Sequence, residues 1–177
     1  PIVFEKGYRD GRVNEFIDEV LRDRLLIDMR GVDQRASEVM EFLFLTGVRY
    51  SEMRRIGGND VMSKGVRVYN FKGMNGRKAE RIVPLNNRAR EIVSGGSLNG
   101  LPEDTSWLRG KLQDACRRTG EDCWRVHDAR HSFASVLVGK GIELGVVRDL
   151  LGHSSVTTTE RYAKVSRAGL ERAVDAL

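Results

Sequence analysis

The chain has 177 residues, of which 40% are hydrophobic and 31% are charged. This length and composition are typical of one folded domain rather than of a disordered segment, so we expect a single domain over residues 1–177. No apolar run approaches the roughly 20 residues of a membrane-spanning helix, and we expect a cytoplasmic protein without a membrane partner. The net charge of +5 and the pI of about 9.5 are in the direction of a phosphate-binding surface.

The spacing of apolar residues predicts a mainly α-helical domain. Helices are expected over residues 14–29, 33–47, 51–56, 86–93, 105–118, 127–140, 144–151, 155–163 and 167–176. Asp33 is the expected N-cap of the second helix, and Gly47 is its expected left-handed C-cap. Near residues 66–71 and 81–83 the apolar period changes to two, which predicts one small antiparallel β-hairpin joined through residues 73–76.

Two of the three histidines flank an arginine in residues 127–133, which read His-Asp-Ala-Arg-His-Ser-Phe. On a helix, His127, Arg130 and His131 share one face, because they are three and four residues apart. One alternative is that His127 and Asp128 only cap the start of a helix. Another is a zinc site, since His-x-x-x-His can bind a metal. The zinc alternative fits poorly, because Asp128 replaces the glutamate of zinc proteases and Arg130 would place a positive charge beside the cation.

Three strings in order resemble the tyrosine recombinase (phage integrase) family. Residues 45–53 read Leu-Thr-Gly-Val-Arg-Tyr-Ser-Glu-Met, residues 127–130 read His-Asp-Ala-Arg, and residues 151–153 read Leu-Gly-His, with Tyr162 nine residues further on. These strings match the Thr-Gly-x-Arg-x-Ser-Glu, His-x-x-Arg and Leu-Gly-His boxes of that family. The family also carries a lysine on a β-hairpin, which corresponds to Lys72. The hairpin turn is longer than in compact members, so Lys78 is an alternative.

The resemblance covers about residues 33–177 and implies the catalytic-domain fold of a site-specific DNA recombinase. Such an enzyme cleaves and rejoins strands through a covalent 3′-phosphotyrosine, without metal, cofactor or ATP. It implies catalytic roles for six residues: Arg49, Lys72, His127, Arg130, His153 and Tyr162.

In these implied roles, Tyr162 is the nucleophile and Lys72 is the general acid for the leaving 5′ oxygen. Arg49 and Arg130 stabilise the negative charge that develops on the phosphate, since a guanidinium is always charged and its forked donors fit phosphate oxygens. His153 adds a hydrogen bond to the same phosphate.

His127, the remaining catalytic residue, acts in proton transfer or orientation. Two further residues have supporting places: Glu52 holds Arg49 or His127, and His131 supports the site or only packs. Trp124 is either a core residue or part of the DNA face.

The implied partner is double-stranded DNA, bound by a homotetramer on paired sites, in a bacterial, phage or archaeal cell. We expect the isolated domain to be monomeric, with residues 167–177 as the element that contacts a neighbouring protomer. Because the first residue is not Met, we also expect a C-terminal part of a longer chain that lacks its N-terminal DNA-binding domain. Two alternatives stay open: a type IB topoisomerase-like enzyme that relaxes DNA, and a non-catalytic DNA-binding module.

Overall fold

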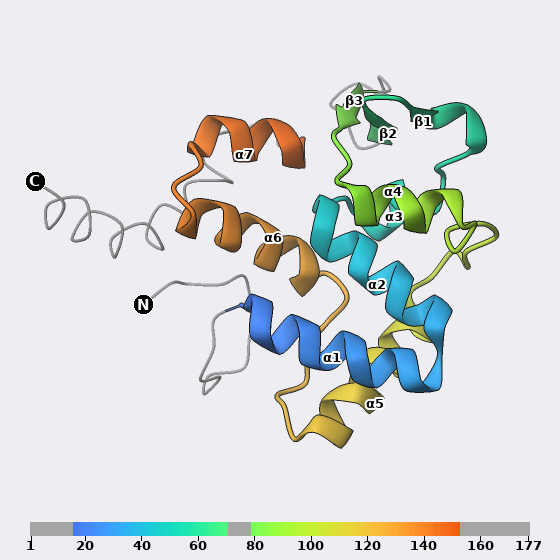
Figure 1. Ribbon diagram of the computed structural model, residues 1–177, viewed down its shortest axis with the longest axis vertical. Helices are drawn as coiled ribbons and strands as arrows, with labels where there is room; N and C mark the ends of the chain where they lie inside the picture. Colours follow the sequence, from blue (N-terminus) through green and yellow to red (C-terminus); the bar gives the residue numbers. More distant parts are fainter. Residues whose placement is uncertain (1–15, 71–78, 153–177) are drawn as a thin grey trace, which may run out of the picture.

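The computed structural model describes residues 16–70 and 79–152 (Figure 1). Its helices are α1 (Glu19–Val32), α2 (Gln34–Thr46), α3 (Tyr50–Met53), α4 (Asn87–Ser94), α5 (Ser106–Thr119), α6 (Asp128–Gly139) and α7 (Leu144–Leu151), with a short 3-10 helix at Gly58–Asp60. Its strands are β1 (Val61–Met62), β2 (Gly65–Asn70) and β3 (Ala79–Val83). The predicted class, mainly α with a small antiparallel sheet, is confirmed. The predicted helices over 155–163 and 167–176 lie outside the described residues.

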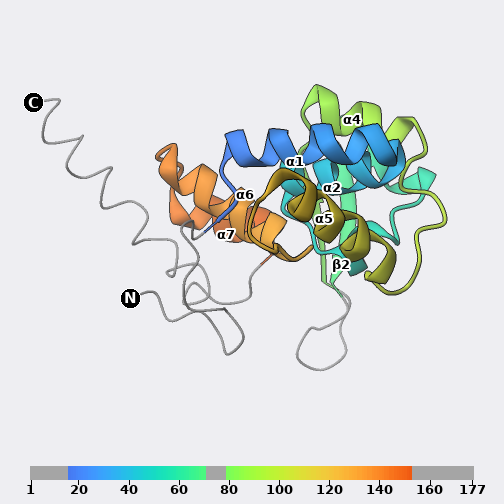
Figure 2. The same cartoon turned by 90° about the horizontal axis from the view of Figure 1, so that it is seen from below.

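Helix α2 lies at the centre of the domain, and α1, α4, α5 and α6 all pack against it (Figures 1 and 2). It starts where Asp33 accepts a hydrogen bond from the backbone N–H of Ala36, and it ends at Gly47, whose φ of 63° is left-handed. Both caps confirm the prediction. Eight of the 13 residues of α2 are buried, as expected for a helix enclosed on several sides.

The first helix differs from its prediction. Helix α1 begins at Glu19, not near residue 14, because the carboxylate of Asp18 accepts a hydrogen bond from the N–H of Leu21 and caps it there. The apolar face that enters the core contains Leu21 and Leu25, whereas Val20, one of the apolar positions whose spacing predicted this helix, is 71% exposed.

The sheet has the antiparallel order β1-β2-β3, so it contains one strand more than the predicted hairpin. Strand β1 has two residues, too few to show a period of two in the sequence. In the β2–β3 register Val66 pairs with Val83 and Val68 pairs with Arg81. Because alternate residues share a face, Arg81 lies on the same side of β3 as the buried Val83, while Ile82 on the other side is 56% exposed.

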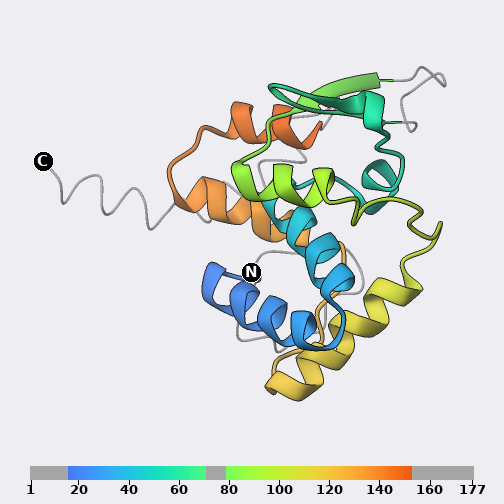
Figure 3. The same cartoon turned by 45° about the vertical axis from the view of Figure 1, so that its right-hand side comes forward.

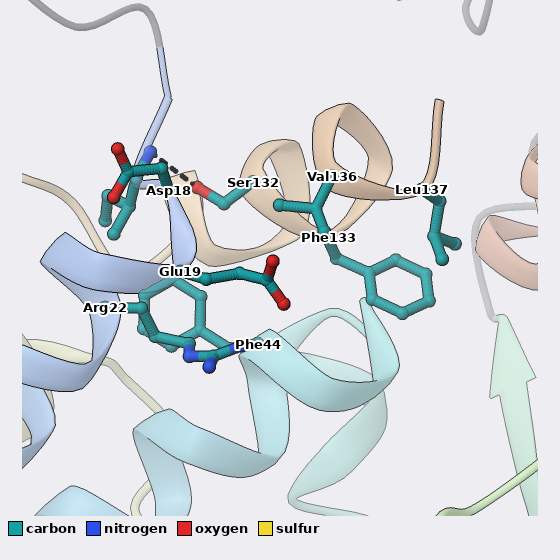
Figure 4. Close-up of a pocket in the computed structure, with 9 residues that line it drawn as sticks. Asp18, Glu19, Arg22, Phe44, Ser132, Phe133, Val136 and Leu137 are labelled. Atoms are coloured by element: carbon teal, nitrogen blue, oxygen red, sulfur yellow. Dashed lines mark hydrogen bonds between the residues drawn. The ribbon is translucent and has the colours of Figure 1, made fainter. Parts of the chain in front are cut away.

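Helices α6 and α7 form a second, smaller apolar cluster through Ala134, Val138, Val147 and Leu151. Figure 3 shows α7 beside the sheet. A hollow of about 40 Å³ lies where α6 meets the start of α1 (Figure 4), and there Ser132 Oγ accepts a hydrogen bond from the N–H of Ile17. This contact joins the start of α1 to the helix that carries the His-x-x-Arg string.

Trp124, immediately before α6, is fully buried. The alternative that it belongs to the DNA face is wrong, because no part of its side chain reaches solvent. Among the described helices, none is both long and apolar enough to cross a bilayer.

Candidate active site

A cavity of about 670 Å³ opens between the start of α3, the start of α6 and the loop before α5. Three of the predicted catalytic residues line it: Arg49, His127 and Arg130. The structure therefore brings together side chains that lie about 80 residues apart in the sequence. The other charged residues that line it are Arg109, Arg125, Glu103 and Asp104.

Arg49 is held at the cavity edge by the buried carboxylate of Glu52. Arg49 lies two residues after the left-handed Gly47 and is the N-cap of α3. Its backbone N–H donates to Glu52 Oε2 at 2.9 Å, and its Nη1 donates to Glu52 Oε1 at 3.0 Å. The side chain of Arg49 keeps 32% of its surface exposed, while that of Glu52 keeps 3%. Of the two partners predicted for Glu52, the structure gives Arg49.

Arg130 joins two of the family strings through their backbones. Its Nη1 donates to the carbonyl oxygen of Gly47 at 2.7 Å, and its Nη2 donates to that of Leu151 at 2.7 Å. The residue is only 4% exposed, so its guanidinium is fixed in direction before any ligand arrives. Pre-set cationic donors of this kind stabilise developing charge at little cost of reorganisation.

The two histidine rings lie edge to face at the start of α6. The centroids of His127 and His131 are 5.0 Å apart, with 88° between the ring planes. Desolvation lowers the pKa of His127, and the positive charge of Arg130 lowers it further. The imidazole is therefore neutral at pH 7 and has a ring nitrogen free to accept a proton.

The start of α6 is fixed by Asp128, whose carboxylate is buried. Its Oδ2 accepts a hydrogen bond from the N–H of Arg125 at 2.8 Å, and its Oδ1 pairs with Arg125 Nη2 at 3.2 Å. Sequence reasoning considered Asp128 only as a cap or as a poor match to a zinc motif. In the structure it orients the turn that presents His127 to the cavity.

Sequence reasoning also missed Arg81 of β3. Its Nη1 and Nη2 donate to the two oxygens of Glu52 at 3.0 and 2.9 Å, and its Nε donates to the carbonyl oxygen of Leu150 at 3.0 Å. One signal was available in the sequence. Arg81 lies two residues before Val83, so both side chains point to the same, apolar side of the strand.

Burial alone would raise the pKa of Glu52. The hydrogen bonds and charge of Arg81, together with those of Arg49, outweigh that effect, and the pKa of Glu52 lies below its usual value. The carboxylate is therefore anionic at neutral pH and binds both guanidinium groups as an ion pair.

The other predicted site residues, Lys72, Lys78, His153 and Tyr162, lie outside the described residues. The structure does describe Gly152, the residue before His153, as the left-handed C-cap of α7, with φ of 66°. Within residues 16–70 and 79–152, no group of three His, Cys, Asp or Glu side chains is arranged to hold a metal ion.

Residues 96–168 match the model of the phage integrase family. The tyrosine recombinase XerC of Staphylococcus carnosus (strain TM300) is 32% identical over 154 residues, which cover 76% of this chain and 50% of that protein. The chain thus spans about half the length of the curated relatives it matches.

Two solved structures have the same fold. The catalytic domain of bacteriophage HP1 integrase matches with a TM-score of 0.67 and 26% identity, over 90% of this chain and 93% of that one. XerH recombinase, solved with its palindromic difH substrate as a post-cleavage complex, matches with a TM-score of 0.68 and 17% identity, over 90% of this chain and 52% of that one.

The fold thus matches that of the catalytic domain of HP1 integrase, and the cavity lined by Arg49, His127 and Arg130 lies within it. The matches extend over most of the described helices and the sheet, and they include the stretch that carries the His-x-x-Arg and Leu-Gly-His strings. Both the sequence and the fold match the phage integrase family.

Proposed function

We propose that this chain is the catalytic domain of a site-specific recombinase that cleaves and rejoins DNA strands through a covalent 3′-phosphotyrosine. One observation carries the proposal: Arg49 and Arg130, from segments far apart in sequence, line the same open cavity together with His127. Two guanidinium groups beside an imidazole fit a phosphodiester, whose negative charge increases in the transition state.

Side chains of this chain supply the nucleophile, the proton donor and the proton acceptor of the cleavage step. The phenolic oxygen of Tyr162 attacks the scissile phosphorus, the P–O5′ bond breaks, and the leaving 5′ oxygen takes a proton from Lys72. His127 is the acceptor for the phenolic proton, because its lowered pKa leaves the imidazole in the neutral form at pH 7. The reverse reaction, with a 5′-hydroxyl as nucleophile, rejoins the strand without an external energy source.

Arg130 supports the placement of His153 in this scheme. The carbonyl oxygen of Leu151 accepts its hydrogen bond, so the end of α7 is tied to the cavity two residues before His153. We place His153 on the same phosphate as Arg130, as the family resemblance implies.

The proposed partner is double-stranded DNA, with a homotetramer assembled on paired sites and the isolated domain monomeric. The net charge of +5 supports an anionic partner. A domain of this kind acts where DNA is present, in the bacterial, archaeal or phage-infected cytoplasm.

The test uses the protein as its gene encodes it, with nicked duplexes prepared from the DNA that flanks that gene and EDTA in the buffer. The nick lets the short cleaved fragment diffuse away, so a covalent adduct accumulates. We expect a protein–DNA band that resists denaturation, that Tyr162→Phe abolishes, and that Tyr69→Phe, a matched change outside the motifs, leaves in place.

Two outcomes would contradict the proposal. DNA binding without any adduct would leave a non-catalytic DNA-binding module. An adduct with relaxation of supercoiled DNA, but with no strand exchange between two sites, would leave the topoisomerase alternative.

A further inference from the structure

Arg81 connects three parts of the candidate active site. It belongs to β3, the strand that leaves the hairpin, and it binds both oxygens of Glu52, the residue that holds Arg49. Its Nε also binds the carbonyl oxygen of Leu150, near the end of α7. The side chain is 13% exposed, and these three hydrogen bonds hold it in place.

The charges explain why Glu52 needs a second arginine. If Glu52 were paired with Arg49 alone, its negative charge would cancel the positive charge that Arg49 offers to a phosphate. In the structure two guanidinium groups share one carboxylate, and the trio carries a net charge of +1. Glu52 is 3% exposed, so little water screens these interactions.

The Arg81 side chain lies close to the backbone of Gly152 at the end of α7. A Cβ atom at Gly152 would lie 2.8 Å from Arg81 Nη1 and 2.9 Å from its Cδ. The glycine of the Leu-Gly-His string therefore serves two purposes: it adopts the left-handed C-cap, and it lets the Arg81 side chain approach the backbone.

We propose that Arg81 is a positioning residue of the cleavage reaction, which offsets the charge of Glu52 so that Arg49 remains available to the scissile phosphate. This inference rests on the proposed function. Arg81 does not contact the phosphate. It acts through Glu52 and Arg49, and it fixes the sheet and α7 to the same carboxylate.

The experiment measures the rate of covalent adduct formation at saturating nicked DNA for Arg81→Met, Arg81→Lys, Glu52→Gln and the double variant Arg81→Met/Glu52→Gln. Arg88→Met is the matched control, because Arg88 also binds both oxygens of one glutamate, Glu41, at 3.1 and 2.9 Å, in the contact between α4 and α2. Thermal unfolding of each variant identifies any that fail to fold.

We expect Arg81→Met to slow adduct formation about 100-fold, because Glu52 then neutralises Arg49, and losing one aligned donor to a transition state has an effect of this size. DNA affinity should change much less. Arg81→Lys keeps the positive charge and should lose less than Arg81→Met. The double variant should be faster than Arg81→Met by about tenfold, because the charge that Arg81 offsets is then absent.

A purely structural role predicts a different pattern. A second change in the buried ion pair would then slow the reaction further, and Arg81→Lys would be as slow as Arg81→Met. Either result overturns the inference, as does an equal loss in Arg88→Met. A wild-type protein that forms no adduct overturns the proposed function and the role of Arg81 with it, whereas an active wild type with an unaffected Arg81→Met overturns the role alone.

Discussion

Replacing Gly47 by alanine tests how the backbone positions the candidate active site. Gly47 has φ of 63°, a left-handed conformation that costs an alanine about 1–2 kcal/mol. A Cβ atom there would also lie 2.3 Å from Cδ1 of Phe133 and 3.0 Å from Cδ2 of Leu151. Relieving such a contact in a packed interior costs about 1–3 kcal/mol.

Together the two effects predict that Gly47→Ala lowers the free energy of unfolding by about 2–5 kcal/mol. The small hollow beside Phe133 in Figure 4 gives the ring only limited room to move away. The carbonyl oxygen of Gly47 also accepts a hydrogen bond from Arg130, so the same change should displace the guanidinium that we propose binds the scissile phosphate.

Gly120→Ala is the matched control. Gly120 is also a left-handed helix C-cap, with φ of 72°, but no atom lies within 4 Å of the Cβ that an alanine would add. Its cost should be the conformational one alone, about 1–2 kcal/mol. Urea unfolding of both variants against wild type measures the difference, and equal losses of stability would refute the steric argument.

Three further predictions follow from the same contacts. Arg130→Lys should slow adduct formation by roughly 100-fold or more, because one ammonium group cannot bind the carbonyls of Gly47 and Leu151 and also face a phosphate. A folded variant with the wild-type rate in a single-turnover assay would contradict this. Because the pKa of His127 is lowered from its ordinary 6.5, a base at this position loses activity only as the pH falls below that value. The acidic limb of the adduct rate at subsaturating DNA should lie below pH 6.5 and disappear in His127→Asn, and a limb that persists in that variant would assign it to another group. Trp124→Ala should lower the free energy of unfolding by about 3–5 kcal/mol, since the side chain is fully buried, and a loss under about 1 kcal/mol in urea unfolding would contradict its place in the core.

Local rules predicted the helices well where a single residue sets a boundary. Asp33 and Gly47 bound α2 as expected, because a carboxylate accepts N-terminal N–H groups and glycine adopts a left-handed φ at low cost. The sequence was misleading at Val20, whose apolar character suggested burial. Asp18 sets the start of α1, and Val20 then lies on the solvent side of that helix.

The sequence predicted the part of the candidate site that lies within short motifs, and it did not predict the contacts that depend on tertiary packing. The strings containing Arg49, His127 and Arg130 named residues that do line one cavity. The contacts of Arg81 with Glu52 and Leu150 depend on how the sheet packs against α3 and α7, and spacing along the chain carries no information about that packing. Only its place on the buried side of a strand hinted that an arginine there needs a partner.

The most direct test of the central claim is the chemical identity of the covalent link. The adduct formed on nicked DNA would be digested with nuclease and protease, and the peptide that carries the nucleotide identified by mass spectrometry. We predict a nucleotide attached through a 3′-phosphate to Tyr162. Attachment to any other residue, or through a 5′-phosphate, would contradict the mechanism.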